Sequence, residues 1–184
     1  MNEGGASEER GLFDRQPVLV GDLVRVRPLA DDDFDSLFAV ASDPLIWEQH
    51  PSKERSERAG FERGFADAMA SGGALIVLDL SDGSVIGSSR YRAFDLDQQE
   101  VEIGWTFLAR SHWGGQANAD LKRLMIGHAF DSDAIDTVVF RVHSLNLRSQ
   151  RAVQKLGAQQ AGTEVDPKGR GENHVYRLGQ MPPA

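Results

Sequence analysis

Apolar residues gather in short runs along the chain, and most of these runs have the length and pattern of β-strands. Residues 23–28 alternate apolar and basic side chains, as an edge or half-exposed strand does, and Pro28 ends the segment. Residues 74–80 and 85–94 are apolar runs on either side of a Ser-Asp-Gly-Ser turn, which predicts a hairpin. Further strands are predicted at residues 102–108, 137–143, 158–165 and 173–178.

Apolar side chains spaced three and four residues apart predict helices between these strands. The acidic run from Asp31 to Asp33 suits the positive end of the first helix, and Gly157 is placed to end the last one. The predicted helices cover residues 31–42, 55–69, 118–130 and 146–156.

The order of these elements predicts an α/β (α+β) fold. Two helices come first, followed by three consecutive strands in an antiparallel meander and a helix that crosses over to a parallel strand. We expect a mixed, mostly antiparallel sheet of six to seven strands with about four helices. Residues 17–180 are predicted to form a single domain, and the polar residues 1–16 a flexible leader.

A glycine-rich turn joins the strand at residues 102–108 to the third helix. It reads Trp113-Gly114-Gly115-Gln116-Ala117-Asn118, and its adjacent glycines permit positive φ and close approach of a ligand to the backbone. Unpaired N–H groups at a helix start bind phosphate oxygens well. An ordinary strand-to-helix connection has the same pattern, so the turn alone leaves both interpretations open.

Composition excludes several classes of function. The chain has 184 residues, 40% of them hydrophobic, which suffices for one domain with a sizeable core. Its net charge of -8 argues against nucleic-acid binding and weakly favours cationic or neutral acceptors. It has no cysteine and its five histidines lack ligand spacing, so neither a thiolate nucleophile nor a metal site is expected.

The hydrophobic pattern also bears on location. No apolar run has the length of a membrane span, and residues 1–16 do not have the apolar stretch of a signal peptide. We therefore expect a cytoplasmic protein that does not bind a membrane.

With these elements in place, the chain resembles the GCN-five-related N-acetyltransferases (GNAT) and, within them, the RimJ/RimL branch. The resemblance covers residues 23–178, and several markers in order are more specific than any one of them. The markers are Arg25-Val26-Arg27-Pro28-Leu29, Ala41-Ser42-Asp43-Pro44 followed by Trp47, Glu102-Ile103-Gly104, Trp113-Gly114-Gly115, Asn146-Leu147-Arg148-Ser149 and Lys155-Leu156-Gly157.

The resemblance implies a GNAT fold in which two central parallel strands, here residues 102–108 and 137–143, splay apart around the pantetheine arm of acetyl-coenzyme A. Backbone groups of Phe107 and Leu108 would then lack a strand partner and could pair with the pantetheine amides. The pyrophosphate would lie on N–H groups of the glycine turn. The implied cofactor-binding residues are Phe107, Leu108, Trp113, Gly114, Gly115, Gln116, Ala117, Asn118, Ala119 and Asn146.

One residue departs from the family pattern. The family turn usually reads Trp-Gly-x-Gly, and its second glycine corresponds to Gln116, while Gly115 occupies the variable place. If position 116 needs positive φ, Gln116 should weaken or shift the pyrophosphate contact. The alternative is a local shift of register in which Gly115 takes that role.

Acetyl transfer to an amine needs a base for the nucleophile and a proton for the leaving thiolate. Glu102 is the candidate base because it lies on the strand that enters the splay, and the alternative is a structural carboxylate paired with Arg90 or Arg92. Many relatives use a tyrosine of the last helix as the acid, but this helix has none. Ser149 is the best replacement there, unless it only helps to cap the helix.

The resemblance therefore implies an N-acetyltransferase that moves the acetyl group of acetyl-CoA to a primary amine by direct attack in a ternary complex, without a metal. The acceptor would be a protein N-terminus or a small-molecule amine. The alternative is a catalytically weak or inactive acyl-CoA-binding module with the same fold, motivated by Gln116 and the missing tyrosine. The expected partners are an amine-bearing acceptor and a second copy in a homodimer, but neither nucleic acid nor a membrane.

Overall fold

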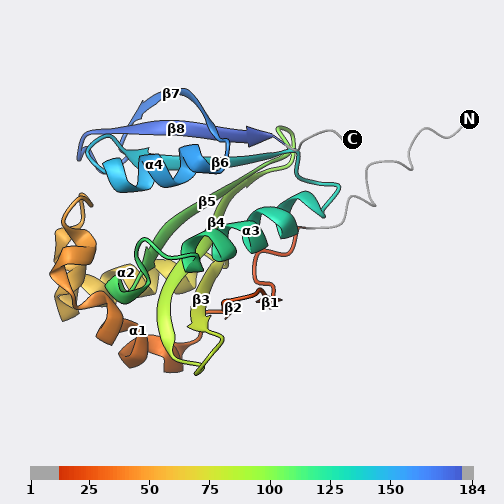
Figure 1. Cartoon of the computed structure of the whole chain (residues 1–184). Coiled ribbons are helices and arrows are strands. Elements are labelled where there is room, and N and C mark those ends of the chain that lie inside the picture. The colour runs from red at the N-terminus through yellow and green to blue at the C-terminus, as the bar shows by residue number, and fades with distance from the viewer. Residues whose placement is uncertain (1–12, 180–184) are drawn as a thin grey trace, which may run out of the picture.

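The computed structural model describes residues 13–179 and shows one eight-stranded sheet with helices on both faces (Figure 1). The strand order is β1-β2-β3-β4-β5-β6-β8-β7. The strands are β1 (Leu19–Val20), β2 (Val24–Pro28), β3 (Ala74–Asp79), β4 (Val85–Asp95), β5 (Glu100–Leu108), β6 (Thr137–His143), β7 (Gln159–Val165) and β8 (Glu172–Gly179). The mixed α+β fold and the predicted strands are confirmed.

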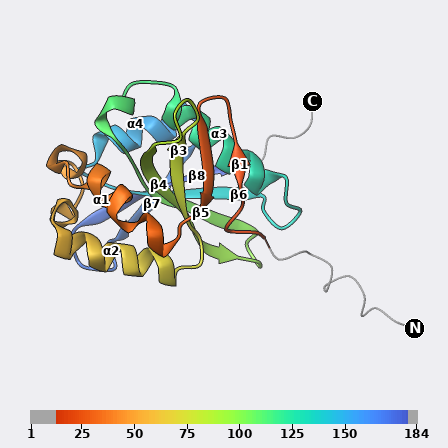
Figure 2. The same cartoon turned by 90° about the horizontal axis from the view of Figure 1, so that it is seen from below.

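Four α-helices accompany the sheet in the described part of the chain, as predicted. Figures 1 and 2 show two of them on each side of it. Among residues 13–179, none of the helices is long and apolar enough to span a membrane. The helices are α1 (Phe34–Ala41), α2 (Arg58–Ala70), α3 (Ala117–Phe130) and α4 (Leu147–Lys155), with short 3-10 helices η1 (Asp31–Asp33), η2 (Pro44–Trp47), η3 (Lys53–Ser56) and η4 (Arg110–His112).

The prediction of six to seven strands was too low, because it did not include the short strand β1. Its two residues pair with β2, with Leu19 opposite Val26 and Val20 opposite Arg25. A segment of two residues has no measurable periodicity, so the hydrophobic pattern could not predict it.

Strands β5 and β6 are parallel, whereas every other pair in the described sheet is antiparallel. Their pairing is brief. It consists of Glu100 with Thr137, Val101 with Val138, and Glu102 with Val139, and it ends there. Figure 1 shows the two strands diverging beyond this point. The splay that the family resemblance implied is therefore present, and its vertex lies at Glu102.

A β-bulge in β5 lies within the splay. Ser88 pairs with Phe107 and Arg90 with Gly104, so β5 has one residue more than β4 in this interval. Trp105 in the bulge has a φ of 52°, which is uncommon for a residue other than glycine. A bulge bends its strand and redirects side chains, so it helps β5 turn away from β6.

The core is divided between the two faces of the sheet. On what we call the α3 face, Tyr91, Leu121, Met125 and Phe140 belong to one cluster, and the Tyr91 hydroxyl donates to the Met125 carbonyl at 2.6 Å. On the opposite α2 face, the other cluster joins α1, α2 and η2 to the sheet through Leu37, Trp47, Phe61, Phe65 and Ile76. Consecutive β4 residues alternate between these faces, since Arg90 bonds to the backbone of α2 and Tyr91 to that of α3.

Packing begins earlier in the chain than the predicted domain boundary at Pro17. Phe13 is buried with 7% of its surface exposed, and its ring lies 5.1 Å from that of Tyr91 in an edge-to-face contact. Phe13 is therefore part of the packed domain, and the rest of the predicted leader, residues 1–12, lies outside the described residues.

Candidate active site

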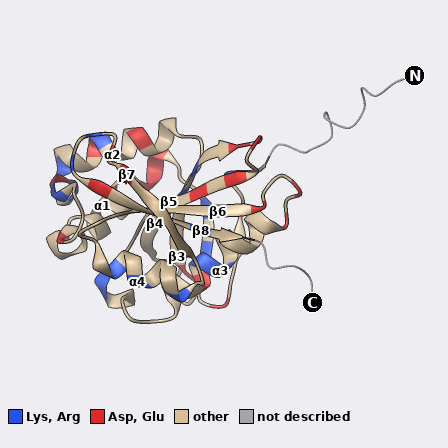
Figure 3. Ribbon diagram, turned by 90° about the horizontal axis from the view of Figure 1, so that it is seen from above, with Lys and Arg blue, Asp and Glu red and all other residues tan. Residues whose placement is uncertain are grey.

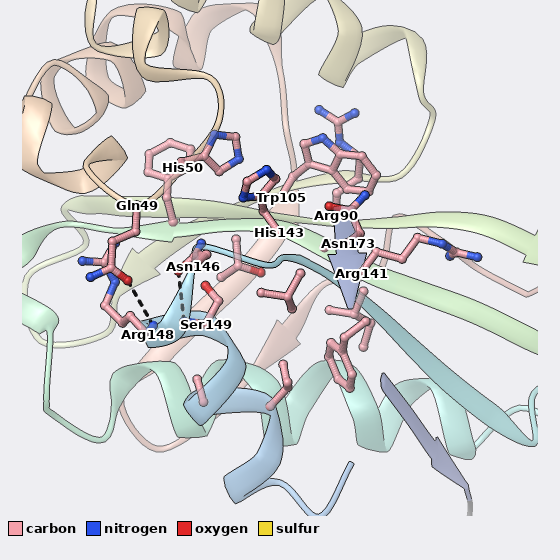
Figure 4. A pocket seen from close by; sticks show the side chains of 18 of the residues that line it. Gln49, His50, Arg90, Trp105, Arg141, His143, Asn146, Arg148, Ser149 and Asn173 are labelled. Atoms are coloured by element: carbon pink, nitrogen blue, oxygen red, sulfur yellow. Dashed lines mark hydrogen bonds between the residues drawn. The ribbon is translucent and has the colours of Figure 1, made fainter. Parts of the chain in front are cut away.

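A cleft of about 1500 Å³ opens where β5 and β6 diverge. Side chains from η2, α2, β4, β5, α3, β6 and α4 line it. Figure 4 shows side chains of several of these strands and of α4 around a common space, among them Arg90, Arg141 and Ser149. Pockets of this kind, large and lined by a few convergent polar groups, are the usual place for substrate binding.

Glu102 lies at the vertex of the cleft and is 5% exposed. Its Oε2 accepts a hydrogen bond from Arg141 Nη1 at 2.9 Å, and Arg141 Nε also binds Glu164 at 2.7 Å. Burial raises the pKa of Glu102, and the Arg141 guanidinium opposes the rise. The carboxylate is thus paired with Arg141 of β6, and not with Arg90 or Arg92 of β4 as the alternative interpretation proposed.

The other carboxylate oxygen of Glu102 faces a position without a side chain. A Cβ added to Gly104 would lie 3.4 Å from Oε1, the oxygen that Arg141 does not bind. A larger residue at position 104 would crowd this oxygen, whereas glycine leaves it accessible. One oxygen is therefore held by a cation, while the other can accept a proton.

Beyond Glu102, the edge of β5 that faces β6 has no strand partner in the described structure. The Phe107 side chain packs on the α2 face, with its ring 5.1 Å from that of Trp47. The Leu108 carbonyl accepts a hydrogen bond from Trp113 Nε1 at 3.0 Å. This oxygen was expected to lack a partner, and it has one. The indole ties the end of β5 to the glycine turn that follows.

In the glycine turn, the positive φ falls on Gly114, at 72°. Gln116 has a φ of −83° at the N-cap of α3, and its side chain is exposed and outside the cleft lining. The turn therefore needs no positive φ at position 116, and Gly115 does not have to replace a glycine there. Ala117 is buried in the core. The turn residues that do line the cleft are Trp113, Gly114, Gly115, Asn118 and Ala119.

The start of α3 is held in place by the carboxylate of Asp120, whose backbone partners are distant from it in the sequence. Asp120 Oδ2 accepts hydrogen bonds from the backbone N–H groups of Leu23 at 2.8 Å and Val24 at 3.1 Å. Its Oδ1 accepts one from Arg123 at 2.7 Å. These bonds fix the first turn of the helix, and hence its exposed N–H groups, against the start of β2.

The N-terminus of α4 forms the opposite wall of the cleft. Asn146 caps this helix, because its Oδ1 accepts a hydrogen bond from the Ser149 N–H at 3.1 Å. The Ser149 hydroxyl lines the cleft and has no hydrogen-bond partner in the described structure (Figure 4). Asn146 therefore does the capping, and the hydroxyl of Ser149 is available to a ligand. Arg148 lies 3.8 Å from the ring centre of Trp113 and links α4 to the turn.

The two tyrosines of the chain do not contribute a hydroxyl to the cleft. Tyr91 and Tyr176 are both buried, with 0% and 1% of their surface exposed, and neither is among the lining residues. No group of His, Asp and Glu residues in the described chain has the arrangement of a metal site.

The sequence pattern missed a lysine on the α3 face of the cleft. Lys122 is 6% exposed, and its Nζ lies 2.7 Å from Thr106 Oγ1, which in turn lies 2.7 Å from Ser89 Oγ. Burial without an acidic partner lowers its pKa to about 7. Lys122 is not one of the positions that make up the apolar stripe of α3, so the hydrophobic pattern did not predict its burial. The available signal was its spacing of four residues from Asn118, which places both on one helix face.

The sequence pattern also missed the group around Trp105 on the α2 face. The guanidinium carbons of Arg90 and Arg92 lie 5.1 Å and 4.7 Å from the centre of the Trp105 ring. Figure 4 shows Trp105 and Arg90 at one end of the cleft, away from Arg148 and Ser149. The spacing of two residues between the arginines, which puts both on one face of β4, was the signal for this group.

Comparison with known proteins agrees with this geometry. Residues 24–159 match the family model described as an acetyltransferase (GNAT) domain. A GCN5-related N-acetyltransferase from Brucella melitensis superposes with a TM-score of 0.78 at 23% identity, covering 89% of this chain and 79% of that one.

Two further solved structures contain coenzyme A or a derivative. Mycobacterium smegmatis RimJ in complex with CoA-disulfide has a TM-score of 0.69 at 16% identity, covering 91% of this chain and 90% of that one. AAC(6')-Ib in complex with ribostamycin and coenzyme A has a TM-score of 0.71 at 19% identity, covering 86% of this chain and 94% of that one. With a family model matched over most of its length and a sheet splayed at Glu102, the chain belongs to the GNAT acetyltransferase family.

Proposed function

We propose that this protein transfers the acetyl group of acetyl-CoA to a primary amine by direct attack in a ternary complex. The observation that carries the proposal is the end of the β5–β6 pairing at Glu102, which joins an unpaired strand edge, a helix N-terminus and a buried carboxylate in one cleft. Each of the three suits a different part of this reaction.

The residues of the cleft fit acetyl-CoA as the acyl donor. Amides of the pantetheine arm would pair with the edge of β5 near Phe107 as another strand would. The pyrophosphate would bind the N–H groups between Gly114 and Ala119, where the positive φ of Gly114 turns the backbone toward the cleft. Asn146 and Ser149 would contact the donor from α4.

The carboxylate supplies the base. Oε1 of Glu102 would accept a proton from the acceptor ammonium, directly or through water, and the raised pKa of this buried group favours that transfer. The neutral amine then attacks the thioester carbonyl, so that a C–N bond forms and the C–S bond breaks. A backbone N–H near Phe107 would polarise the carbonyl. The departing thiolate takes a proton from Ser149 or from water.

The acceptor and the branch of the family are the finer parts of this proposal. The ordered sequence markers resemble the RimJ/RimL branch, for which a protein N-terminus is the acceptor that the resemblance implies, and RimJ from Mycobacterium smegmatis shares the fold. The aminoglycoside bound by AAC(6')-Ib supports a small-molecule amine. We propose a primary amine in either case, because a protein N-terminus and an amine of a small molecule present the same nucleophile to the cleft.

Release of free coenzyme A thiol from acetyl-CoA across a panel of amines tests the function. We expect amine-dependent thiol release above the background without amine, together with an acetylated product of the expected mass. Binding of acetyl-CoA without thiol release for any amine would favour the inactive module. The absence of a tyrosine from α4 and from the cleft lining supports that alternative.

A further inference from the structure

The cleft has a charge opposite in sign to that of the whole chain. The net charge of the chain is -8, yet eleven Lys and Arg side chains line the cleft against four carboxylates. Figure 3 shows acidic residues on the connection between α3 and β6, at the end of the sheet away from α1. A cleft with an excess of positive charge attracts and orients anions.

Each of the four carboxylates in the cleft already has a basic partner within it. The ion pairs are those of Glu102 and Glu164 with Arg141, Asp166 with Arg170, and Asp67 with Lys168. The other basic side chains of the cleft therefore have no acidic partner among residues 13–179. Their charge is left for a ligand to balance.

Arg90 is the least exposed arginine of this group, at 6%, and matches Lys122 in burial. Its hydrogen bond goes to the Asp67 carbonyl at 3.4 Å, which is a weak contact with a neutral group. Burial and the neighbouring Arg55 lower the pKa of Arg90 to about 10, so it remains charged at neutral pH. Asp67 and Glu102 act on Arg90 only over a longer range than an ion pair, because each of them is paired with another basic side chain. The burial of Arg90 is therefore only partly compensated, and a bound anion would offset the remaining cost.

Arg55, Arg90 and Arg92 form what we call the arginine cluster. Arg90 and Arg92 both lie against Trp105, and Arg55 is close enough to Arg90 to lower its pKa. Guanidinium groups bind carboxylates and phosphates through paired hydrogen bonds, which gives them geometric specificity for oxyanions. The cluster therefore has the chemistry of an oxyanion site.

The position of the cluster assigns it to the acceptor rather than to the phosphates of the donor. Arg92 lies directly opposite Glu102 on the neighbouring strand, and Arg90 lies opposite Gly104. Both arginines are on the α2 face, whereas the glycine turn leads into α3 on the other face. An anion held by the cluster would thus be within one or two residue spacings of the proposed base.

We propose that the acceptor is a primary amine that also carries a carboxylate or phosphate group, which the arginine cluster binds while Glu102 faces the amine. This inference rests on the proposed function and narrows its class of acceptor. It reverses the expectation from net charge that the acceptor is cationic or neutral, because the local field of a site, and not the total charge, selects its ligand.

Matched pairs of amines test this proposal. Phosphoethanolamine with ethanolamine, and β-alanine with β-alanine amide, share an amine and differ in the anionic group. We expect kcat/KM for the anionic member of at least one pair to exceed that of the neutral member by roughly 10- to 100-fold, as for a charged hydrogen bond. The pair with the larger ratio tells whether phosphate or carboxylate is preferred.

Three variants locate the effect. Arg90→Met should bring the ratio close to one, because kcat/KM for the anionic member falls much more than that for the neutral member. Arg92→Met should also reduce the ratio. Because Arg92 is exposed, we expect this variant to fold even if Arg90→Met does not. Arg151→Met is the matched control, since Arg151 is an exposed arginine of the same cleft on α4 and should leave the ratio of the parent unchanged.

Two outcomes would overturn the inference while the proposed function stands. One is a parent ratio of one or less for both pairs, and the other is a ratio that neither Arg90→Met nor Arg92→Met reduces. If no amine supports thiol release, the proposed function fails, and calorimetry with the same pairs decides the inference. Preferential binding of the anionic member that is lost in Arg90→Met supports it, and equal binding of both members rejects it.

Discussion

The two walls of the cleft bury charged side chains to a similar degree but with different results. On the α2 face, Glu102 is 5% exposed and shares Arg141 with Glu164. On the α3 face, Lys122 is 6% exposed and contacts only the Thr106 hydroxyl and, at 5.6 Å, the ring of Phe140. Its pKa falls to about 7, because no carboxylate compensates the lost hydration.

The contrast shows that burial alone does not decide the state of an ionisable group. Where a counter-charge lies within hydrogen-bonding distance, as Arg141 does for Glu102, a buried group remains part of an ionic network. Where the neighbours are a hydroxyl and an aromatic ring, the group changes its charge near neutral pH. The α2 face therefore suits recognition of charge, and the α3 face suits the uncharged middle of a ligand.

The largest effect is expected at the base on the α2 face. Glu102→Gln should lower turnover by about 10²-fold, with acetyl-CoA affinity and melting temperature near those of the parent, because Arg141 keeps Glu164 as its partner. The loss should shrink as pH rises, since more of the acceptor amine is then neutral without help. Turnover across a pH series, with calorimetry for acetyl-CoA, measures both.

Glu164→Gln is the matched control for this variant, because it removes the other carboxylate bound to Arg141. It should keep turnover near that of the parent. If Glu102→Gln retained full activity at neutral pH, or lost stability together with activity, the carboxylate would be structural and water would remove the amine proton.

A smaller effect, on stability, is expected at the unpaired charge of the α3 face. The unfolded chain holds the proton of Lys122 up to its ordinary pKa near 10, whereas the folded protein releases it above about 7. Between these values the unfolded state binds more protons, so stability rises with pH, by at most about 1.4 kcal/mol per pH unit. Lys122→Met removes this dependence, and its stability advantage should be greatest at or below pH 7.

Chemical denaturation of the parent and of Lys122→Met at several pH values between 6 and 10 would measure this difference. Lys155→Met is the control, since Lys155 lines the same cleft with an exposed side chain and should show no such trend. A constant difference between parent and Lys122→Met over the whole range would mean that Lys122 keeps its proton when folded, and the two faces would then not differ as described.

The smallest effect is expected at the glycine turn, where the α3 face meets the donor. Gly114→Ala places a side chain at a φ of 72°, which costs about 1 kcal/mol even though the added Cβ meets no neighbour. The dissociation constant of acetyl-CoA should rise a few-fold as the backbone adjusts. Gln116→Gly should change it by less than about two-fold, because residue 116 already has an ordinary helical φ. Calorimetry on both variants would show the reverse order if position 116 directs the turn.

Regular elements could be predicted from the sequence because their apolar spacing depends on local geometry alone. The helix at Phe34–Ala41 and the strand at Thr137–His143 were predicted from spacing and β-branched residues, and both are present. The boundary at Pro17 failed because Phe13 packs on Tyr91, a contact between residues distant in the sequence. Such contacts leave no local periodic signal.

The candidate site was predictable where it depends on the backbone and much less so where it depends on partners. The glycine turn follows from its turn pattern, and the splay beside Glu102 was implied by the family resemblance. The pairing of Glu102 with Arg141 depends instead on contacts between strands distant in the sequence. The sign of the charge in the cleft was likewise hidden, because net charge averages over side chains that the fold sends to different surfaces. Only the arrangement in space separates Arg90 from the acidic loops.

The chain contains three tryptophans, and all of them line the cleft. Trp47 is buried beside Phe107, Trp113 lies under Arg148, and Trp105 lies beside Arg90 and Arg92. The tryptophan fluorescence of this protein therefore originates entirely from residues that line the cleft. Emission changes on adding donor or acceptor can be followed without a label, and replacing one indole at a time by phenylalanine separates the optical response of one end of the cleft from that of the other.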